Sequence, residues 1–215
     1  TEIYTLSLHD ALPISLSKIP IKTIRDLEGK RVHMTMPNGT PDIAIRYCLE
    51  TLKITPKEKL YMQTEQALDQ LKDGKLDVVL FAMGLPTSMI LDLQATHDIR
   101  MVDISLEDQK AVIEKYPYFA KAVIPAGTYE NMPKDINTFA FWNYAVCDKD
   151  LPDDLVYQMT KAVYENKKDF EATSAYGKEL FAKNIVNAVV PLHPGAARYY
   201  KEMGIEVPAH LLPTE

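Results

Sequence analysis

Cysteine is scarce in this sequence: Cys48 and Cys147 are the only two among 215 residues. They stand in no C-x-x-C or Cys/His spacing, which argues against a disulfide framework and against a zinc site. The five histidines are scattered without H-E-x-x-H spacing, so the sequence gives no support for a metal site. We therefore expect two buried structural thiols.

The sequence also lacks basic clusters, long apolar runs and internal repeats. A net charge of −6 without a basic run argues against nucleic acid as a partner. No apolar stretch approaches the roughly 20 residues of a membrane-spanning helix. What remains is ordinary globular composition, 47% apolar and 25% charged, in a chain long enough for one large core or two small lobes.

Catalytic motifs are missing as well. The sequence has no G-x-S-x-G, no recognisable Ser/His/Asp set, no paired-carboxylate motif and no P-loop. His97 and Asp98 could be an acid–base pair, but "THD" is more typical of a helix end that leads into a strand. We therefore expect no enzyme and no cofactor.

Helical and strand patterns alternate between about residues 22 and 123. Strands are expected at 31–36, at the apolar run "VVLFA" (78–82) and at "IRMVDIS", with amphipathic helices between them. One helix has Thr40 as its expected N-cap, and another should break at Tyr116–Pro117. This alternation predicts an α/β lobe with a mainly parallel sheet, in which "VVLFA" is covered on both faces.

The later part of the chain has a different character. The turn-rich segment 125–136 precedes a long aromatic segment, 137–149, that should be extended. From residue 150 onward we expect helices and no second set of strands, with Gly204 ending the last helix. Helices without a sheet to cover suggest that a partner segment is missing.

Two loops are candidates for a ligand site. "PNGTPD" (37–42) and "FAMGLPT" (81–87) each join an expected strand to an expected helix. Ligands of open α/β sheets bind at the carboxyl ends of strands, and N–H groups at a helix start suit a carboxylate or phosphate. The first loop could equally be a capped turn with Gly39 in a left-handed conformation. Two such loops in one lobe could converge on one small anion.

Three further segments have both a functional and a structural interpretation. Tyr129, after the expected turn at Gly127 and Thr128, could close over a pocket or pack on a surface loop. "FWNYAV" could be a core strand or could present Phe141 or Asn143 to a cleft. "PLHPGAARYYKEMG" is more typical of helix packing than of ligand contact. The candidate ligand-binding residues are thus Asn38, Gly39, Thr40, Gly84, Pro86, Thr87, Tyr129 and Asn143.

Five stretches carry a resemblance to a known family: "LEGKRVHM", "LDVVLFAMGLPTSMILDLQATHDIRMV", "IEKYPYFAKAVIPAGTY", "DLPDDLVYQMTKAVYEN" and "PLHPGAARYYKEMG". From about Ile21 to Gly204 the chain resembles the TAXI family of solute receptors of TRAP transporters. The resemblance implies a type II periplasmic-binding-protein fold of two α/β lobes, a cleft and hinge strands. It also implies an extracytoplasmic protein without catalytic residues, which passes a small carboxylate such as glutamate to a TRAP membrane permease. The alternatives are an effector-binding domain of a transcription regulator and a small transferase.

The resemblance extends to the two candidate loops. Gly39 and Thr40 match a "GSGTE"-like ligand loop, and Asn38 stands where serine is common. The pair Pro41–Asp42 departs from the family pattern, which leaves the ligand open. Gly84, Pro86 and Thr87 match a loop that ends Gly-x-Pro-Thr in the family.

The opening stretch "TEIYTLSLHDALPIS" fits neither a helical nor a strand period, and it is no signal peptide. Back-translated, residues 1–14 agree with one reading frame of a sequencing-library adapter. We therefore expect a non-native segment without structural role at 1–14, in front of an N-terminally truncated receptor whose signal peptide is missing. The expected parts are α/β lobe two with the outgoing crossover at 15–123, a returning hinge at 124–149 and the helical part of lobe one at 150–215. Helices without their sheet should make the chain poorly soluble.

Overall fold

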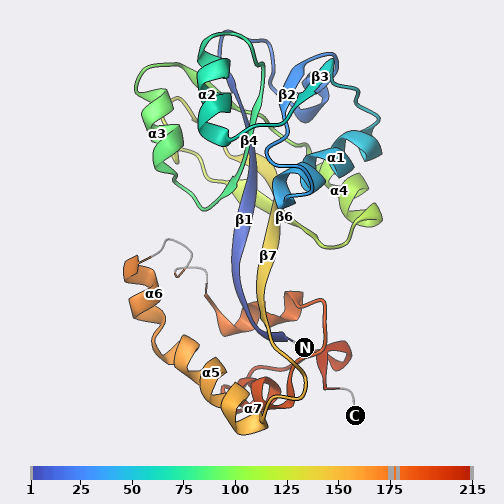
Figure 1. The fold of residues 1–215 in the computed structure, drawn as a ribbon, viewed down its shortest axis with the longest axis vertical. Helices are drawn as coiled ribbons and strands as arrows, with labels where there is room; N and C mark the ends of the chain where they lie inside the picture. The colour runs from blue at the N-terminus through green and yellow to red at the C-terminus, as the bar shows by residue number, and fades with distance from the viewer. Residues whose placement is uncertain (1, 174–176, 178–179, 214–215) are drawn as a thin grey trace. The chain divides into compact units, whose positions relative to one another are not determined.

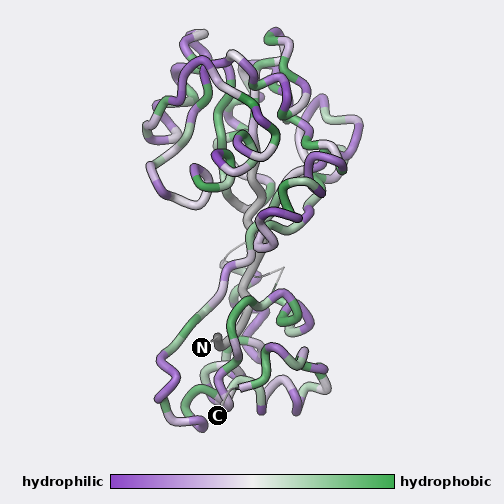
Figure 2. The backbone as a smooth tube through the Cα atoms, turned by 90° about the vertical axis from the view of Figure 1, so that its right-hand side faces the viewer, coloured by the Kyte–Doolittle hydropathy of each residue, from purple (hydrophilic) through white to green (hydrophobic). Residues whose placement is uncertain are grey.

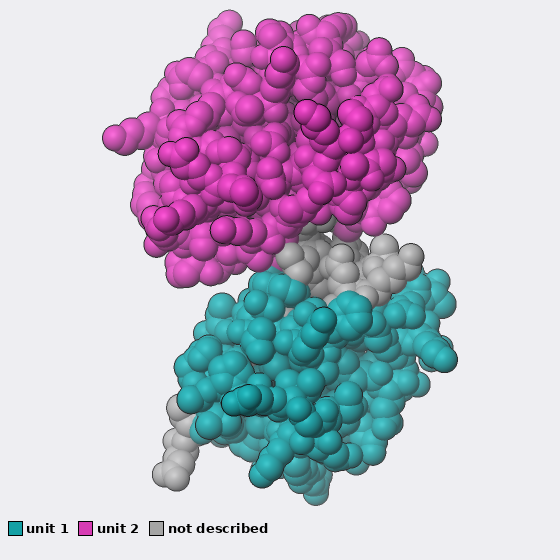
Figure 3. Space-filling model, turned by 180° about the vertical axis from the view of Figure 1, so that it is seen from behind, with its two compact units in different colours: residues 1–8, 142–215 teal, residues 9–141 magenta. Residues whose placement is uncertain are grey.

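A computed structural model describes residues 2–173, 177 and 180–213. The chain is a mixed α/β protein, as expected from the alternating patterns. It divides into two compact units (Figure 3). Unit 1 consists of residues 1–8 and 142–215, and unit 2 consists of residues 9–141. Each unit is described separately below.

The main sheet has the strand order β4-β1-β7-β6, with β5 also paired to β1. Its strands are β1 (Glu2–Leu16), β4 (Val79–Met83), β5 (Ile99–Met101), β6 (Phe119–Ile124) and β7 (Ile136–Val146). The strands β4 and β5 both pair antiparallel with β1, and β6 pairs antiparallel with β7. The expectation of a mainly parallel sheet is therefore wrong for these strands, because β1 lies between β4 and β5 and runs in the opposite direction.

Unit 2 also contains parallel pairing, including an isolated parallel bridge between Thr23 and Asp103. Strands β2 (Arg31–His33) and β3 (Glu58–Leu60) pair in parallel, and an isolated parallel bridge joins Val32 to Val78 just before β4. The expected strand at 31–36 is thus shorter than predicted, and the segment after Met34 forms the loop that leads to the next helix.

The helices of unit 2 lie on the faces of its strands (Figure 1). They are η1 (Ile24–Leu27), α1 (Thr40–Leu52), α2 (Thr64–Lys72), α3 (Ser88–Gln94) and α4 (Leu106–Lys115). Gly39, not Thr40, is the N-cap of α1, so the expected cap is wrong by one residue. The predicted break after α4 is confirmed, since the helix ends at Lys115 and Tyr116 leaves the helical conformation.

Two hydrophobic clusters form the core of unit 2. Val79, Leu80 and Phe81 are all buried, so the prediction that "VVLFA" is covered on both faces is confirmed although β4 pairs antiparallel. Cys48 is buried in one cluster, where burial raises the pKa of its thiol. Cys147 is only partly buried, so the expectation of two buried thiols holds for Cys48 alone.

The strand β1 gives the opening segment a structural place. Residues Asp10–Ile14 pair with β4, and Ile14 is fully buried in the core. The carbonyl oxygen of Pro13 accepts a hydrogen bond from the Val102 N–H at 2.9 Å. The expectation that residues 1–14 have no structural role is therefore wrong, because this segment supplies the partner strand for both β4 and β5.

Unit 1 is built mainly from helices: α5 (Asp153–Glu165), α6 (Lys167–Thr173), η3 (Ala182–Asn187), α7 (Pro194–Glu202) and η4 (Ala209–Leu211). No strand follows β7 in the part of the chain that the structure describes. Tyr199 and Tyr200 of α7 are buried and pack against Tyr164 of α5, which confirms the prediction of an aromatic packing helix. Gly204 ends α7 with φ = +70°, as expected.

Candidate functional site

The two candidate loops leave the same edge of unit 2. The parallel bridge between Val32 and Val78 gives β2 and β4 the same direction, and the His33 N–H donates to the Val78 carbonyl at 3.0 Å. The segment after β2 leads into α1, and the segment after β4 leads into α3 (Figure 1). Carboxyl ends of strands with a common direction share one edge, which is where ligands of α/β sheets bind.

The first loop, residues 34–39, contains two residues with left-handed backbone. Thr35 has φ = 59° and Asn38 has φ = 62°. Non-glycine residues rarely adopt this region, and such residues concentrate at functional sites. Gly39 is extended with φ = −73°, so the left-handed conformation that one of the two interpretations gave it is wrong. Asn38 takes that conformation instead.

Asp42, in the first turn of α1, binds back to this loop. The residue is 1% exposed, and Oδ2 of its carboxylate accepts hydrogen bonds from the Asn38 N–H at 2.8 Å and from Arg46 Nε at 3.1 Å. The Gly39 N–H donates to the Met36 carbonyl at 3.1 Å. The N–H groups of Asn38 and Gly39 are thus used within the chain. Binding of a solute by these residues stays a prediction.

The second loop, residues 84–87, is tied to a distant residue. The Thr87 N–H donates to the Tyr129 hydroxyl at 3.1 Å, and both residues are buried. The turn before Tyr129 forms as predicted: Gly127 has φ = +76°, and the Thr128 hydroxyl donates to the Pro125 carbonyl at 2.7 Å. Two candidate residues that lie 42 positions apart therefore meet directly.

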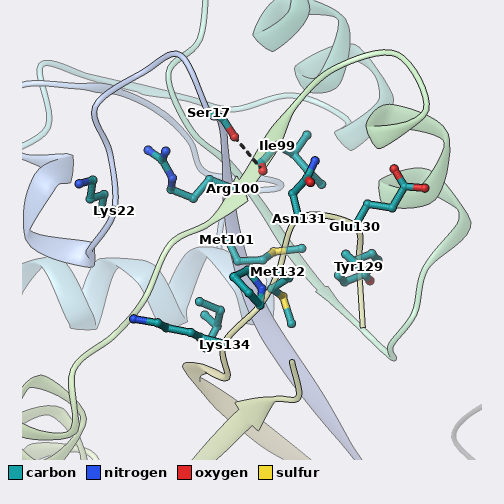
Figure 4. A pocket seen from close by; sticks show the side chains of 12 residues that line it. Ser17, Lys22, Ile99, Arg100, Met101, Tyr129, Glu130, Asn131, Met132 and Lys134 are labelled. Atoms are coloured by element: carbon teal, nitrogen blue, oxygen red, sulfur yellow. Dashed lines mark hydrogen bonds between the residues drawn. The ribbon is translucent and has the colours of Figure 1, made fainter. Parts of the chain in front are cut away.

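A cavity of about 320 Å³ within unit 2 is lined in part by Tyr129. Lys22, Arg100 and Lys134 lie on one side of it, and Glu130 and Tyr129 lie on the other (Figure 4). The full lining is Ser17, Lys22, Ile99, Arg100, Met101, Tyr129, Glu130, Asn131, Met132, Pro133, Lys134 and Ile136. Tyr129 thus borders a pocket, as one of its two interpretations anticipated, and it is the only one of the eight candidate residues in this lining.

Asn143 lies in the part of β7 that belongs to unit 1, whereas the other seven candidate residues belong to unit 2. Its contribution to a site stays a prediction. Gly84 and Pro86 lie in the same loop as Thr87, and the side chains of Asn38 and Thr40 are exposed at the start of α1.

Asp42 was absent from the sequence-based candidates. Two features of the sequence could have pointed to it. Asp42 is an acidic residue in the first turn of a helix, four residues before Arg46. The pair Pro41–Asp42 also departs from the family pattern. Spacing predicts a surface ion pair for this arrangement. Burial of the carboxylate depends on the loop that folds over it, which spacing does not show.

The titratable groups near the first loop have shifted pKa values. Burial lowers the pKa of His33, whose Nε2 lies 3.0 Å from the Met62 carbonyl oxygen. Burial raises the pKa of the Tyr61 hydroxyl, and the Asp42 carboxylate raises it further. His33 is therefore neutral near pH 7, and Tyr61 keeps its proton.

The described residues offer neither a metal centre nor a membrane-spanning helix. Among the described residues, no group of three or more His, Cys, Asp or Glu side chains could hold a metal ion. Within the same part of the chain, every helix is too short or too polar to cross a bilayer.

The sequence matches the NMT1-like family over residues 3–204. The chain belongs to the NMT1-like family. This match begins inside the opening stretch and so does not support its exclusion as non-native.

Several solved structures are similar to this member of the NMT1-like family. One comes from a study of glutathione import in Streptococcus mutans, at 15% identity and a TM-score of 0.46. A second is a histidine-bound ABC substrate-binding protein from Streptococcus pneumoniae, at 17% identity and a TM-score of 0.46. A third is a probable amino-acid ABC extracellular-binding protein from Bacillus subtilis, at 18% identity and a TM-score of 0.45. The matches cover 82–83% of this chain but 59–62% of the other chains. This chain therefore spans less than two thirds of their length.

Proposed function

We propose that this protein is an extracytoplasmic solute-binding protein and not an enzyme. It is the receptor of a TRAP transporter of the TAXI type, and it captures a small solute with a carboxylate group for delivery to the membrane permease. The observation that carries the proposal is the pair of loops, 34–39 and 84–87, which leave one edge of unit 2 and begin α1 and α3. This is the usual place for a ligand in an α/β sheet.

The polar groups at this edge suit binding more than catalysis. The side chains of Asn38 and Thr40 are exposed beside α1, and Thr87 lies at the start of α3 against Tyr129. Amide and hydroxyl groups of this kind orient a ligand by hydrogen bonds. Because three backbone N–H groups of the loops already have partners in the chain, recognition should depend mainly on side chains.

The transporter class rests on the resemblance of the quoted stretches to TAXI receptors. The solved structures named above belong to ABC systems by their descriptions, so an ABC permease is the alternative partner. Pull-down of the purified protein with each type of permease in detergent would separate the two partners.

Solute binding is tested by isothermal titration of the full chain with the common amino acids and with C4 to C6 dicarboxylates. We expect at least one solute to bind without being converted, as checked by NMR of the solute after incubation. The Thr87→Val variant lacks one hydroxyl group, and its affinity for that solute should be about tenfold lower. The matched control Thr96→Val, whose hydroxyl bonds only locally to Leu93 and His97, should not change its affinity.

Two outcomes contradict the proposal. Conversion of any solute to a product would favour the transferase alternative. Absence of binding across the whole panel would remove the solute-binding assignment itself.

A further inference from the structure

The cavity of about 320 Å³ in unit 2 extends away from the two candidate loops. Strand β1 runs antiparallel to β4. Ser17 follows the carboxyl end of β1 and lines the cavity, so this part of the cavity lies toward the amino end of β4. The loop 84–87 follows the carboxyl end of β4 instead. Tyr129 also lines the cavity and contacts that loop at Thr87, so the cavity and the loop are neighbouring but separate places.

Positive charge gathers on one side of this cavity. Lys22, Arg100 and Lys134 lie there, and Glu130, the one acidic side chain among the described lining residues, lies on the opposite side (Figure 4). The three cations come from segments far apart in the sequence, because Lys22 follows β1, Arg100 belongs to β5 and Lys134 precedes β7. In a chain with a net charge of −6, a local excess of positive charge favours an anionic ligand.

The donor groups of these side chains are open to a ligand. Arg100 Nη1 donates to the carbonyl oxygens of Ile19 and Ile21 at 3.4 Å, which holds the guanidinium group in place. Among the described residues, Arg100 Nε and Nη2 have no acceptor, and the ammonium groups of Lys22 and Lys134 form no hydrogen bond or ion pair. A guanidinium edge of two N–H groups matches a phosphate or a carboxylate, and lysine binds phosphate as a point charge.

The acidic residues beside the two lysines in the sequence are engaged with backbone groups. Asp26 Oδ2 accepts hydrogen bonds from the N–H groups of Lys22 and Thr23 at 2.8 Å each. Asp135 Oδ1 accepts one from the Ala126 N–H at 2.8 Å. The charge of Lys22 acts on Asp26 through space, but in the described part of the chain neither carboxylate forms an ion pair with a lysine of the cavity.

The cavity also has an apolar surface. Ile99, Met101 and Met132 are buried residues of its lining, and the two methionines lie between the cationic side and Glu130 (Figure 4). Thioether side chains adapt their shape to an apolar ligand. A volume of about 320 Å³ is at the low end for a ligand cavity, which suits a small molecule with one charged end and one apolar end.

We propose that this cavity binds a small phosphate monoester, with the phosphate group held by Lys22, Arg100 and Lys134 and the apolar part on Met101 and Met132. A phosphate monoester carries a charge of about −2 and three acceptor oxygens at one end, which match the three cations. A dicarboxylate would place its second charge toward the acidic side of the cavity, where like charges repel. This site goes beyond the proposed function, because it gives the protein a second ligand besides the transported solute.

The direct test titrates the full chain, labelled with [methyl-¹³C]methionine, with phenyl phosphate, benzoate and inorganic phosphate. By calorimetry, phenyl phosphate should bind at least about tenfold more tightly than the other two, because benzoate carries less charge and inorganic phosphate has no apolar part. In NMR spectra, phenyl phosphate should shift the methyl signals of Met101 and Met132, assigned with Met101→Leu and Met132→Leu. The signal of Met159 in unit 1 should not move.

A pair of lysine substitutions tests the cationic side. Lys22→Gln/Lys134→Gln should bind phenyl phosphate at least about tenfold more weakly, because two charge-assisted hydrogen bonds are lost. Both residues are exposed, so this variant should fold like the wild type, which circular dichroism checks. The matched control is Lys57→Gln/Lys121→Gln, which removes two exposed lysines of unit 2 outside the cavity lining and should keep the wild-type affinity.

Four results would overturn the inference. Phenyl phosphate fails to bind, its methyl shifts fall outside Met101 and Met132, or both double variants weaken it equally, which would mean attraction to the general surface charge. The fourth is competition between phenyl phosphate and the transported solute, because the two would then share one site. A chain that binds a solute but no phenyl phosphate keeps the proposed function, whereas a chain that binds phenyl phosphate but no solute keeps the cavity site and loses the proposed function.

Discussion

The two units bury their apolar residues to different extents. In the part of the chain that the structure describes, unit 2 contains two hydrophobic clusters built from both strands and helices, whereas unit 1 contains one cluster of seven buried residues, which depends largely on α5 and α7. Among the residues whose burial the structure describes, ten of the sixteen exposed large hydrophobic residues lie in residues 142–213, although this segment is much shorter than unit 2. Hydrophobic segments occur along the backbone of both units (Figure 2).

The difference shows what a sheet contributes to a small unit. Strands let helices bury one whole face against a continuous surface, and unit 2 has this arrangement. The helices of unit 1 bury mainly the stripes that face one another, so hydrophobic residues remain exposed on them. We expect unit 1 to be the less stable of the two, since burial of apolar area is the main stabilising term.

The largest predicted effect is the loss of stability caused by a cavity in the core of unit 2. Phe139 on β7 is 1% exposed, and its ring packs edge-on against Phe119 at a centroid distance of 5.0 Å. Phe139→Ala should lower the free energy of unfolding by about 3–5 kcal/mol, because it removes an aromatic ring and leaves a cavity. Differential scanning calorimetry should show this loss in the transition of unit 2 only.

The counterpart in unit 1 is Ile185→Ala, at a fully buried position of η3. This substitution should lower the free energy of unfolding by an amount near the lower end of about 2–5 kcal/mol, because a small core can collapse around the cavity. If both variants shift a single common transition, the two units do not unfold separately and the comparison fails.

A second prediction concerns the contact between α5 and α7. A Cβ atom on Gly195 would clash with the Asp153 carbonyl oxygen and would lie 2.8 Å from the Tyr157 nitrogen. Gly195→Ala should therefore force the two helices apart, at a cost near the upper end of about 1–3 kcal/mol, and lower the melting temperature of unit 1 measured by circular dichroism.

Gly204→Ala is the control for this variant. Gly204 has φ = +70° with open space around it, so alanine there adds about 1 kcal/mol of backbone strain without a clash. Equal effects of the two substitutions would show that α5 and α7 do not pack as closely as described.

The smallest predicted effect is a change in the stability of unit 2 at low pH. Burial of Asp77 tends to raise its pKa, but hydrogen bonds from Arg31 at 2.6, 2.8 and 3.0 Å outweigh burial, and the pKa is lowered. The stabilisation is therefore present above the ordinary carboxyl pKa of about 3.9 and is lost as the pH falls through the lower folded value.

Asp77→Asn removes this ion pair while keeping the shape of the side chain. It should cost about 1–3 kcal/mol near pH 7 and make the stability of unit 2 less dependent on pH below 4. Urea unfolding between pH 2.5 and 7 measures both quantities. An unchanged pH dependence would mean that other carboxyl groups control the acid transition.

Most helices of unit 2 and the long strand β7 could be predicted from the sequence. Pro41 at the start of α1, the Tyr116–Pro117 break and the turn at Gly127 act through local backbone geometry, so short segments are enough to locate them. The strand β6 was not predicted, because its alternating pattern follows directly on the helical segment before it.

The candidate site could be predicted only as two loops. Their place at the ends of β2 and β4 followed from the order of elements, but their hydrogen bonds did not. Asp42 takes the Asn38 N–H, and Tyr129 takes the Thr87 N–H from 42 residues away. These contacts occupy two of the backbone N–H groups that the sequence alone would have left open for a ligand.

The sequence by itself determined the approximate positions of most helices of unit 2, and that the chain is a mixed α/β protein, because the spacing of apolar residues and the steric limits of proline and glycine are local properties. Only the tertiary structure decided the antiparallel pairing of β1 with β4 and β5, and the burial of Asp42 beneath its loop. Strand direction and burial depend on contacts between residues far apart in the chain, whose free energy no short segment contains.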